Sequence, residues 1–271
     1  MGKNKLRKFA EMAQFGCVMQ YPFATLQNQS FPLKGRWHEH FGNDNPIVLE
    51  LGCGKGEYAV GLARMFPDKN FIGIDIKGAR MYTGAKIAEN EGLSNVAFLR
   101  TSIELLQHFF EPGEVSEIWI TFPDPQMKKV NKRLTSTRFL TLYRGVLADG
   151  GIIHLKTDSP FLSAYTRAML KESGITPTYD TSDLYGNGGV YVDTATLKPV
   201  IPVPNLRTHY EQQWLERGLS INYIEFPLAA EAQLAEPDVE IPFDTYRSYS
   251  RRSPKGTTSD TQTDTTTESN S

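Results

Sequence analysis

The pattern that most constrains this chain begins near residue 45, where short runs of apolar and β-branched residues alternate with stretches of helical periodicity. The runs predict strands at 47–51, 70–75, 95–99, 117–121 and 151–156. The intervening and following stretches predict helices at 56–66, 78–91, 103–110, 135–147 and 161–173. Such an order is typical of βαβ units, because right-handed crossovers place the helices on both faces of a parallel sheet.

The region after the last of these helices is less regular. Residues 174–206 contain several glycines and prolines, and we expect one strand and a long surface excursion there. Residues 208–218 predict a helix, and residues 219–226 predict a closing strand. The predicted fold class is therefore α/β, a doubly wound, Rossmann-like fold with a single seven-stranded, mostly parallel sheet.

Charge divides the chain into three predicted parts. Residues 1–45 are a basic N-terminal extension, residues 46–228 are the domain, and residues 229–271 are an acidic segment that ends in a Ser/Thr-rich tail. The net charge is −2, but residues 229–244 hold five carboxylates and no basic residue, so the rest of the chain carries +3. We expect the Ser/Thr-rich end to be disordered, because it lacks apolar residues that could pack.

Composition also bears on the location of the protein. No apolar run approaches the roughly 20 residues of a membrane-spanning helix, and the basic N-terminus lacks the apolar stretch of a secretory signal. The two cysteines, Cys17 and Cys53, are too few for a zinc site or a disulfide framework. We therefore expect a cytoplasmic protein with no membrane partner and no metal site.

A glycine-rich turn, ELGCGKG at residues 50–56, ends the first predicted strand. Gly52 and Gly54 allow the backbone to turn sharply and a ligand to approach without a Cβ in the way. Asp75 ends the second strand, where a carboxylate can accept hydrogen bonds from ribose hydroxyls. These residues predict a cofactor site at the carboxyl ends of the first two strands.

Two acidic residues distinguish the possible cofactors. The dinucleotide fingerprint needs glycine at position 57, where this chain has Glu57. Glu50 would repel a pyrophosphate, whereas it suits the cationic end of S-adenosylmethionine. The loop therefore favours a class I S-adenosylmethionine-dependent methyltransferase over a dehydrogenase; a glycine turn without a ligand is the structural alternative. Thr101 and Ser102, just past the third strand, are candidates to face the adenine, and a helix cap explains either equally well.

A second motif, FPDP at residues 122–125, follows the fourth strand. Ligands of open α/β sheets bind outside the carboxyl ends of the strands, so we expect Asp124 to point at the cofactor site. The basic sequence QMKKVNKRLT, residues 126–135, comes next. A basic loop at the rim of the site suits a polyanionic substrate, and a merely solvated face is the alternative interpretation.

Together with two later motifs, this sequence resembles the bacterial tRNA (guanine-N7)-methyltransferases of the TrmB family. FPDP followed by lysines and KRLT, LKTD at residues 155–158 and THYE at residues 208–211 match the family's motifs in order, and the likeness spans residues 48–226. Three positions depart from the family pattern. Gln126 replaces a tryptophan, Ser102 replaces an aspartate, and Val130-Asn131 shortens an Arg-His run.

The resemblance implies a role for each matched residue. With Gly52 and Gly54, the cofactor S-adenosylmethionine would be bound by Glu50, Asp75, Ser102 and Asp124, and Asp124 would also be catalytic. The substrate, tRNA, would be contacted by Lys128, Asp158, Thr208 and Glu211. The implied reaction is methyl transfer to N7 of a guanine, in the variable loop. Asp158 as a helix cap and Glu211 as an exposed helix residue are the structural alternatives.

The chemistry of guanine N7 suggests how the site would work. N7 has a free lone pair, so the reaction needs alignment of the reactants more than a general base. We expect Asp124 and Asp158 to accept hydrogen bonds from the guanine N1–H and amino group, and to favour the positive charge that N7 acquires. The residues expected to bind phosphates are Lys128, Lys129, Lys132 and Arg133.

Two other functions and the oligomeric state stay open. A methyltransferase of the same fold could act on another substrate, and a non-catalytic RNA-binding module could retain the fold. Either a monomer or a homodimer is compatible with the sequence.

Overall fold

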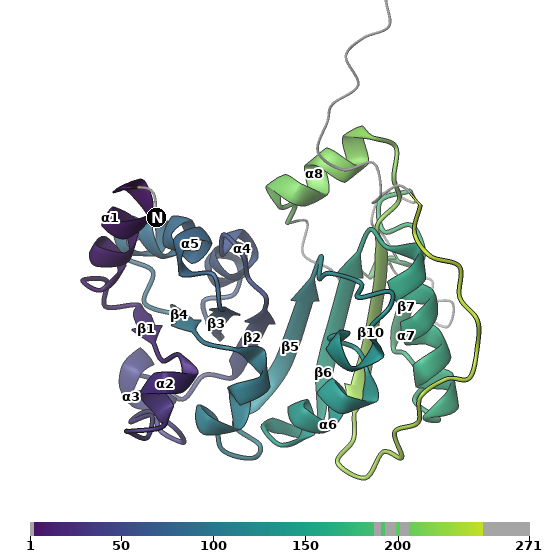
Figure 1. Cartoon of the computed structure of the whole chain (residues 1–271), viewed down its shortest axis with the longest axis horizontal. Helices are drawn as coiled ribbons and strands as arrows, with labels where there is room; N and C mark the ends of the chain where they lie inside the picture. The colour runs from purple at the N-terminus through teal and green to yellow at the C-terminus, as the bar shows by residue number, and fades with distance from the viewer. Residues whose placement is uncertain (1–2, 187–190, 193–198, 201–205, 246–271) are drawn as a thin grey trace, which may run out of the picture.

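The computed structural model describes residues 3–186, 191–192, 199–200 and 206–245. One sheet of eight strands organises these residues, in the order β1-β4-β3-β2-β5-β6-β10-β7 (Figure 1). Its strands are β1 (Val18–Gln20), β2 (Ile47–Leu51), β3 (Asn70–Asp75), β4 (Val96–Arg100), β5 (Val115–Thr121), β6 (Leu147–Thr157), β7 (Tyr179–Thr181) and β10 (Asn222–Leu228). Neighbouring strands are parallel except where β10 pairs with β6 and β7. The doubly wound α/β prediction is confirmed.

Helices cover both faces of the sheet. The alternation of side chains along β2 shows the division, because Leu49 and Leu51 pack in one apolar cluster and Val48 packs in the other. The cluster of Val48 also holds side chains from α1 (Lys3–Met12), α4 (Glu57–Met65) and α5 (Gly78–Glu91). The opposite cluster holds side chains from α3 (Trp37–Phe41), α6 (Thr137–Arg144) and α7 (Pro160–Glu172). Glu50 shares the face of Val48 and so lies towards α4.

The remaining elements are short. They are α2 (Phe23–Leu26), α8 (His209–Glu216), the 3-10 helices Ile103–His108 and Val130–Lys132, and the paired strands β8 (Tyr191–Val192) and β9 (Pro199–Val200). None of the described helices is long and apolar enough to cross a membrane.

The structure differs from the sequence prediction at several elements. Strand β6 begins at Leu147, where the prediction has the end of a helix, and β8 pairs with β9 in the region predicted as a surface excursion. Strand β1 comes from the predicted N-terminal extension and pairs in parallel with β4, so the sheet has eight strands instead of seven. Three residues are too few to show an alternating pattern, which is why this strand was missed. The predicted helix at 103–110 is a 3-10 helix over Ile103–His108.

The acidic segment after β10 packs against the domain. Residues 229–245, which we call the strap, pass beside α7 and are yellow-green in Figure 1. Arg144 of α6 donates hydrogen bonds to the carbonyl oxygens of Ala230 and Ala232, and Glu236 accepts one from Tyr165 of α7. The predicted disordered end, residues 246–271, lies outside the described residues.

Candidate functional site

The glycine-rich turn after β2 leaves space for a ligand. Gly52 and Gly54 have φ angles of 76° and 54°, in the left-handed region that favours glycine. Among the described residues, no atom lies within 4 Å of a Cβ built on Gly52, and only the Gly52 carbonyl oxygen approaches one built on Gly54. Gly56 differs, because a Cβ there would come within 2.5 Å of the Phe98 ring. The first two glycines therefore border open space, and the third permits close packing.

Asp75, at the end of β3, supports this turn. Its Oδ2 accepts a hydrogen bond from the Gly54 N–H at 2.9 Å, and its Oδ1 accepts one from the Lys77 N–H at 2.7 Å. A carboxylate offers about four lone-pair sites, so further acceptor capacity is available to a ribose. Asp75 thus lies where the sequence placed it, against the glycine turn.

Glu50 is buried, with 3% of its surface exposed, and its carboxylate joins two neighbouring elements. Oε1 accepts from the Thr121 hydroxyl at 2.8 Å, and Oε2 accepts from the Ala59 N–H in the first turn of α4 at 2.9 Å. Burial raises the pKa of Glu50 to about 8, although both hydrogen bonds act to lower it. Because burial disfavours the ionised carboxylate, a cation bound nearby would restore its charge.

The FPDP loop follows directly after the residue that contacts Glu50. Thr121 ends β5, and β5 pairs with β2, so Asp124 follows at the same edge of the sheet as the glycine turn. Asp124 is exposed, and its Oδ1 accepts from the Gln126 N–H at 3.1 Å. Phe122 and Gln126 have φ angles of 48° and 47°, a conformation that costs a side chain about 1–3 kcal/mol. Strain on both sides of Asp124 is typical of a functional loop.

Ser102 lies at the same edge, after β4. It precedes the 3-10 helix Ile103–His108, and its carbonyl oxygen accepts from the Leu105 N–H at 2.9 Å. Its neighbour Thr101 is buried and donates its hydroxyl to the Tyr21 carbonyl oxygen. Thr101 therefore fixes the chain after β1. Ser102 is the N-cap residue of the 3-10 helix, as the structural alternative expected, although its hydroxyl makes no capping hydrogen bond.

The LKTD motif ends β6. Asp158 is only 2% exposed, and the helix-cap alternative does not hold, because Ser159 is the N-cap residue of α7. The Ser159 hydroxyl oxygen accepts from the Leu162 N–H at 3.0 Å. Asp158 therefore lies one residue before the cap, in the loop between β6 and α7.

Thr208 and Glu211 form a reciprocal cap at the start of α8. The Thr208 hydroxyl accepts from the Glu211 N–H, and the Glu211 carboxylate accepts from the Thr208 N–H, each at 3.2 Å. Glu211 is fully buried and forms an ion pair with Lys156 of β6 at 2.7 Å, so the exposed-helix alternative is wrong. The His209 N–H donates to Glu57, at the start of α4. The start of α8 is thereby tied both to the end of β6 and to α4.

The basic loop after β5 contains residues in different environments. Lys128 and Lys129 are exposed, whereas Lys132 pairs with Glu104 at 2.9 Å. Arg133 is only 6% exposed and donates to the carbonyl oxygens of Gln126 and Met127. The prediction that Arg133 binds phosphate is therefore wrong, because its guanidinium closes the loop from inside.

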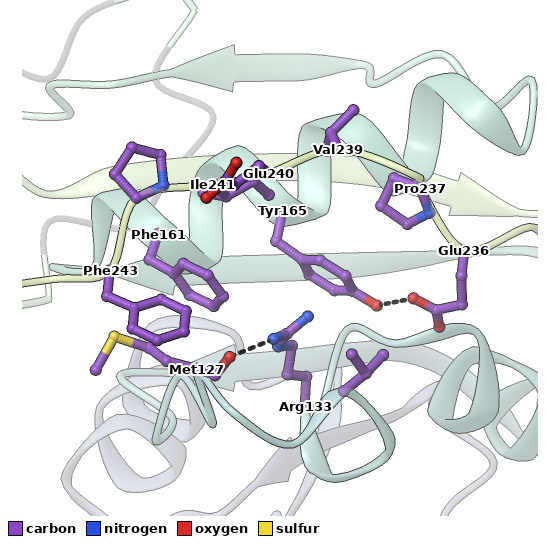
Figure 2. A pocket seen from close by; sticks show the side chains of 12 residues that line it. Met127, Arg133, Phe161, Tyr165, Glu236, Pro237, Val239, Glu240, Ile241 and Phe243 are labelled. Atoms are coloured by element: carbon purple, nitrogen blue, oxygen red, sulfur yellow. Dashed lines mark hydrogen bonds between the residues drawn. The ribbon is translucent and has the colours of Figure 1, made fainter.

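A cavity of about 560 Å³ lies beside this loop (Figure 2). Figure 2 shows Arg133 from the loop and Phe161 and Tyr165 from α7 facing residues of the strap. The Arg133 guanidinium lies 4.8 Å from the Phe161 ring centre and 4.4 Å from that of Tyr165. The glycine turn does not line this cavity, which lies between the basic loop, α7 and the strap.

Sequence reasoning missed three residues that organise the site. Thr121 contacts Glu50, Lys156 contacts Glu211, and Asp244 of the strap contacts Ser159. Lys156 lies inside the matched LKTD motif, which was a usable signal. Nothing in the local sequence around Asp244 indicated a partner 85 residues away.

Comparisons with known proteins agree with this arrangement. The family model described as "Putative methyltransferase" matches residues 44–222. The tRNA (guanine-N(7)-)-methyltransferase of Bacteroides fragilis is 57% identical over 257 residues, which are 94% of this chain and 98% of the relative. That of Porphyromonas gingivalis is 62% identical over 244 residues, which are 89% of this chain and 96% of the relative.

A solved structure shows the same fold. The crystal structure of the 16S rRNA methyltransferase KamB superposes with a TM-score of 0.52 at 15% identity, covering 74% of this chain and 95% of that one. The two sequence relatives named above are much more similar to this chain, at 57% and 62% identity over nearly their whole length. The chain therefore belongs to the TrmB family of bacterial tRNA (guanine-N7)-methyltransferases.

Proposed function

We propose that this protein transfers the methyl group of S-adenosylmethionine to N7 of a guanine in tRNA. One observation carries the proposal: three carboxylates lie at the ends of three neighbouring strands. Glu50 is the last residue but one of β2, Asp75 ends β3, and Asp124 follows β5. Two exposed lysines, Lys128 and Lys129, come shortly after Asp124. The relatives named above carry the same activity in their names, which supports the assignment.

The residues around the glycine turn fit the cofactor. Gly52 and Gly54 border open space, Asp75 offers acceptors for ribose hydroxyls, and Glu50 offers a buried negative charge to a cation. When bound, S-adenosylmethionine supplies an electrophilic methyl group on a sulfonium. We assign Ser102 and Asp124 to the same site from their places at the ends of β4 and β5.

Asp124 is the proposed catalytic residue. The hydrogen bond from the Gln126 N–H fixes one carboxylate oxygen, and the other can accept from the guanine N1–H or amino group. A fixed carboxylate favours the positive charge that develops on N7 without having to reorganise during the reaction. Asp158 is the second proposed acceptor. Because it is only 2% exposed, contact with a base requires that the segments covering it move apart.

Exposed positive charge supports a nucleic-acid substrate. We propose that Lys128 and Lys129 bind tRNA phosphates, and that Thr208 and Glu211, at the start of α8, also contact the tRNA. The variable loop as target is part of the same proposal and rests on the family resemblance. The cytoplasm as location is also proposed, because the substrate is tRNA. The three-part division of the chain at residues 45 and 228 is likewise kept as a proposal.

The direct test is incubation with labelled S-adenosylmethionine and tRNA that lacks the modification, followed by mapping of the methylated nucleoside. We expect label in 7-methylguanosine and a large loss of turnover in Asp124→Ala. Label in another nucleoside would contradict the proposed target atom. If calorimetry detects no binding of S-adenosylmethionine, the non-catalytic alternative is correct instead.

A further inference from the structure

The strap ends between two loops that carry proposed site residues. Asp244 is 6% exposed, and its Oδ1 accepts from the Phe161 N–H at 3.0 Å, while its Oδ2 accepts from the Ser159 hydroxyl. Both partners belong to the first turn of α7, immediately after Asp158. A carboxylate at a helix N-terminus is stabilised by the free N–H groups there. The side chain of Asp244 therefore fixes the strap to the loop of Asp158.

The backbone of the same residue reaches the other loop. The Asp244 N–H donates to the Met127 sulfur at 3.2 Å, and Met127 lies three residues after Asp124 and directly before Lys128. Met127 also accepts the hydrogen bond from the buried Arg133 through its carbonyl oxygen. Asp244 thus touches the basic loop that follows FPDP with its main chain and the β6–α7 loop with its side chain.

Other contacts hold the strap in register. The Glu236 carboxylate accepts from the N–H and the hydroxyl of Thr137, at the start of α6, and from the Tyr165 hydroxyl of α7. The Phe243 ring packs edge-on against Phe161 at 5.5 Å. These contacts spread the strap over both helices, so that the position of Asp244 is defined by the domain itself.

We propose that Asp244 is a positioning residue, which holds the loop of Asp124 and Lys128 at a fixed distance from the loop of Asp158. The proposal rests on the proposed function, since it assumes that these two loops meet the tRNA guanine. Misplacement of a reacting group by about 1 Å can cost about a hundredfold in rate. Asp244 acts through both loops and need not touch the substrate.

Four variants of the full chain test this. Asp244→Ala removes the side-chain contacts. Asp244→Asn keeps the shape and one acceptor oxygen for the Phe161 N–H, and its amide nitrogen can donate to the Ser159 hydroxyl oxygen. Met127→Leu removes the sulfur acceptor at similar volume, and Asp238→Ala is the matched control at an exposed strap carboxylate. We expect Asp244→Ala to lower kcat on tRNA at least about tenfold, with the affinity for S-adenosylmethionine within twofold of wild type. Asp244→Asn should recover most of kcat, and Asp238→Ala should match wild type.

Two further readouts separate this role from simple stabilisation. The side-chain contacts of Asp244 and its contact with Met127 together link the same two loops. The effects of Asp244→Ala and Met127→Leu on kcat should therefore be less than additive in the double variant. Hydrogen exchange should rise in both loops of Asp244→Ala. A lower Tm with unchanged kcat well below that Tm would overturn the proposal, as would full additivity. If the wild-type protein fails to methylate tRNA, the proposed function is wrong. Hydrogen exchange then still tests the positioning role, because faster exchange in only one of the two loops of Asp244→Ala would refute it.

Discussion

The Lys156 ammonium and the Glu211 carboxylate lie 2.7 Å apart with neither side chain exposed, and this ion pair joins β6 to α8. The ammonium also donates to the Tyr185 hydroxyl at 3.0 Å and to the Leu206 carbonyl oxygen at 3.1 Å. All three of its donors are thereby used. Burial lowers the pKa of Lys156, and the charge of Glu211 opposes that change. Glu211 thus stabilises the fold as well as lying in the matched THYE motif.

Glu211→Ala should destabilise the protein by about 3–5 kcal/mol, because it leaves a buried charge without its partner. The double variant Lys156→Met/Glu211→Leu should regain most of that loss, since apolar side chains replace both charges. Urea unfolding measures both effects. The double variant also isolates the substrate role: if its stability returns but its KM for tRNA stays high, Glu211 contacts the substrate directly. Equal stability of Glu211→Ala and wild type would contradict the structural role.

Binding of S-adenosylmethionine should strengthen as pH rises towards 8. The pKa of Glu50 is raised from 4.5 to about 8, so its carboxyl is mostly protonated at lower pH and must lose a proton to face a cation. Without the cofactor, stability due to this group falls as pH rises from about 4.5 through about 8. Affinity should therefore rise by up to about tenfold per pH unit below 8, measured by calorimetry.

The control for this prediction is Glu50→Gln. Glutamine has nearly the same shape and can still bond Thr121 and the Ala59 N–H. Any titration of the cofactor's own amino group affects both proteins equally, so their difference reports Glu50 alone. The same pH dependence in wild type and Glu50→Gln would show that Glu50 keeps its charge throughout.

Substitutions in the basic loop should affect either tRNA binding or stability, depending on whether the residue is exposed or buried. Lys128→Ala/Lys129→Ala should reduce the slope of log Kd for tRNA against log salt by about one per lysine, with no change in Tm. Arg133→Met should lower Tm and leave the salt slope unchanged, because its buried guanidinium donates to the Gln126 and Met127 carbonyl oxygens. A filter-binding titration over several salt concentrations and a thermal melt distinguish the two. A reduced salt slope in Arg133→Met would argue against its assignment to the interior.

Local pattern was enough to predict the central sheet. The strands at 47–51 and 70–75 match β2 and β3 at both ends, because buried parallel strands are continuous apolar runs bounded by turn residues. Glu50, Asp75 and Asp124 were placed at one sheet edge by the rule that parallel strands end together. The sequence could not show that Arg133 points inward, since a positively charged residue is usually exposed. Its burial depends on the Phe161 and Tyr165 rings, whose faces attract the guanidinium.

Contacts between distant segments were beyond local inference. The strap has no apolar period, so its sequence predicted no packed element there, yet Glu236 and Asp244 accept hydrogen bonds from α6 and α7. Strand β1 has three residues, and it pairs with residues of β4 that lie 80 positions later in the chain. The packing of the strap and the pairing of β1 both satisfy backbone N–H groups of distant elements. Those groups come within reach only when the domain is folded.

The glycines of the turn after β2 should differ in what their substitution costs. Gly56→Ala puts a Cβ within 2.5 Å of the Phe98 ring and 3.3 Å of the Gly84 Cα, at a φ of 72°. We expect it to lower the free energy of unfolding by more than the about 1–2 kcal/mol that a left-handed alanine costs. Gly52→Ala has a similar φ of 76° but a Cβ that meets no described atom within 4 Å, so its cost should stay near that value.

Cofactor binding should rank the two variants in the opposite order, with Gly52→Ala affected more than Gly56→Ala. The pair therefore tests where the cofactor lies. The Cβ of Gly52→Ala would occupy the open space beside the turn, so S-adenosylmethionine should bind at least about tenfold more weakly, a difference of about 1.4 kcal/mol. Lys55→Ala, in the same turn, is the control for general disturbance. Calorimetry gives the affinity, and urea unfolding gives the stability. If Gly52→Ala binds the cofactor as wild type does, the open space beside Gly52 is solvent, and the cofactor must lie against another part of the edge.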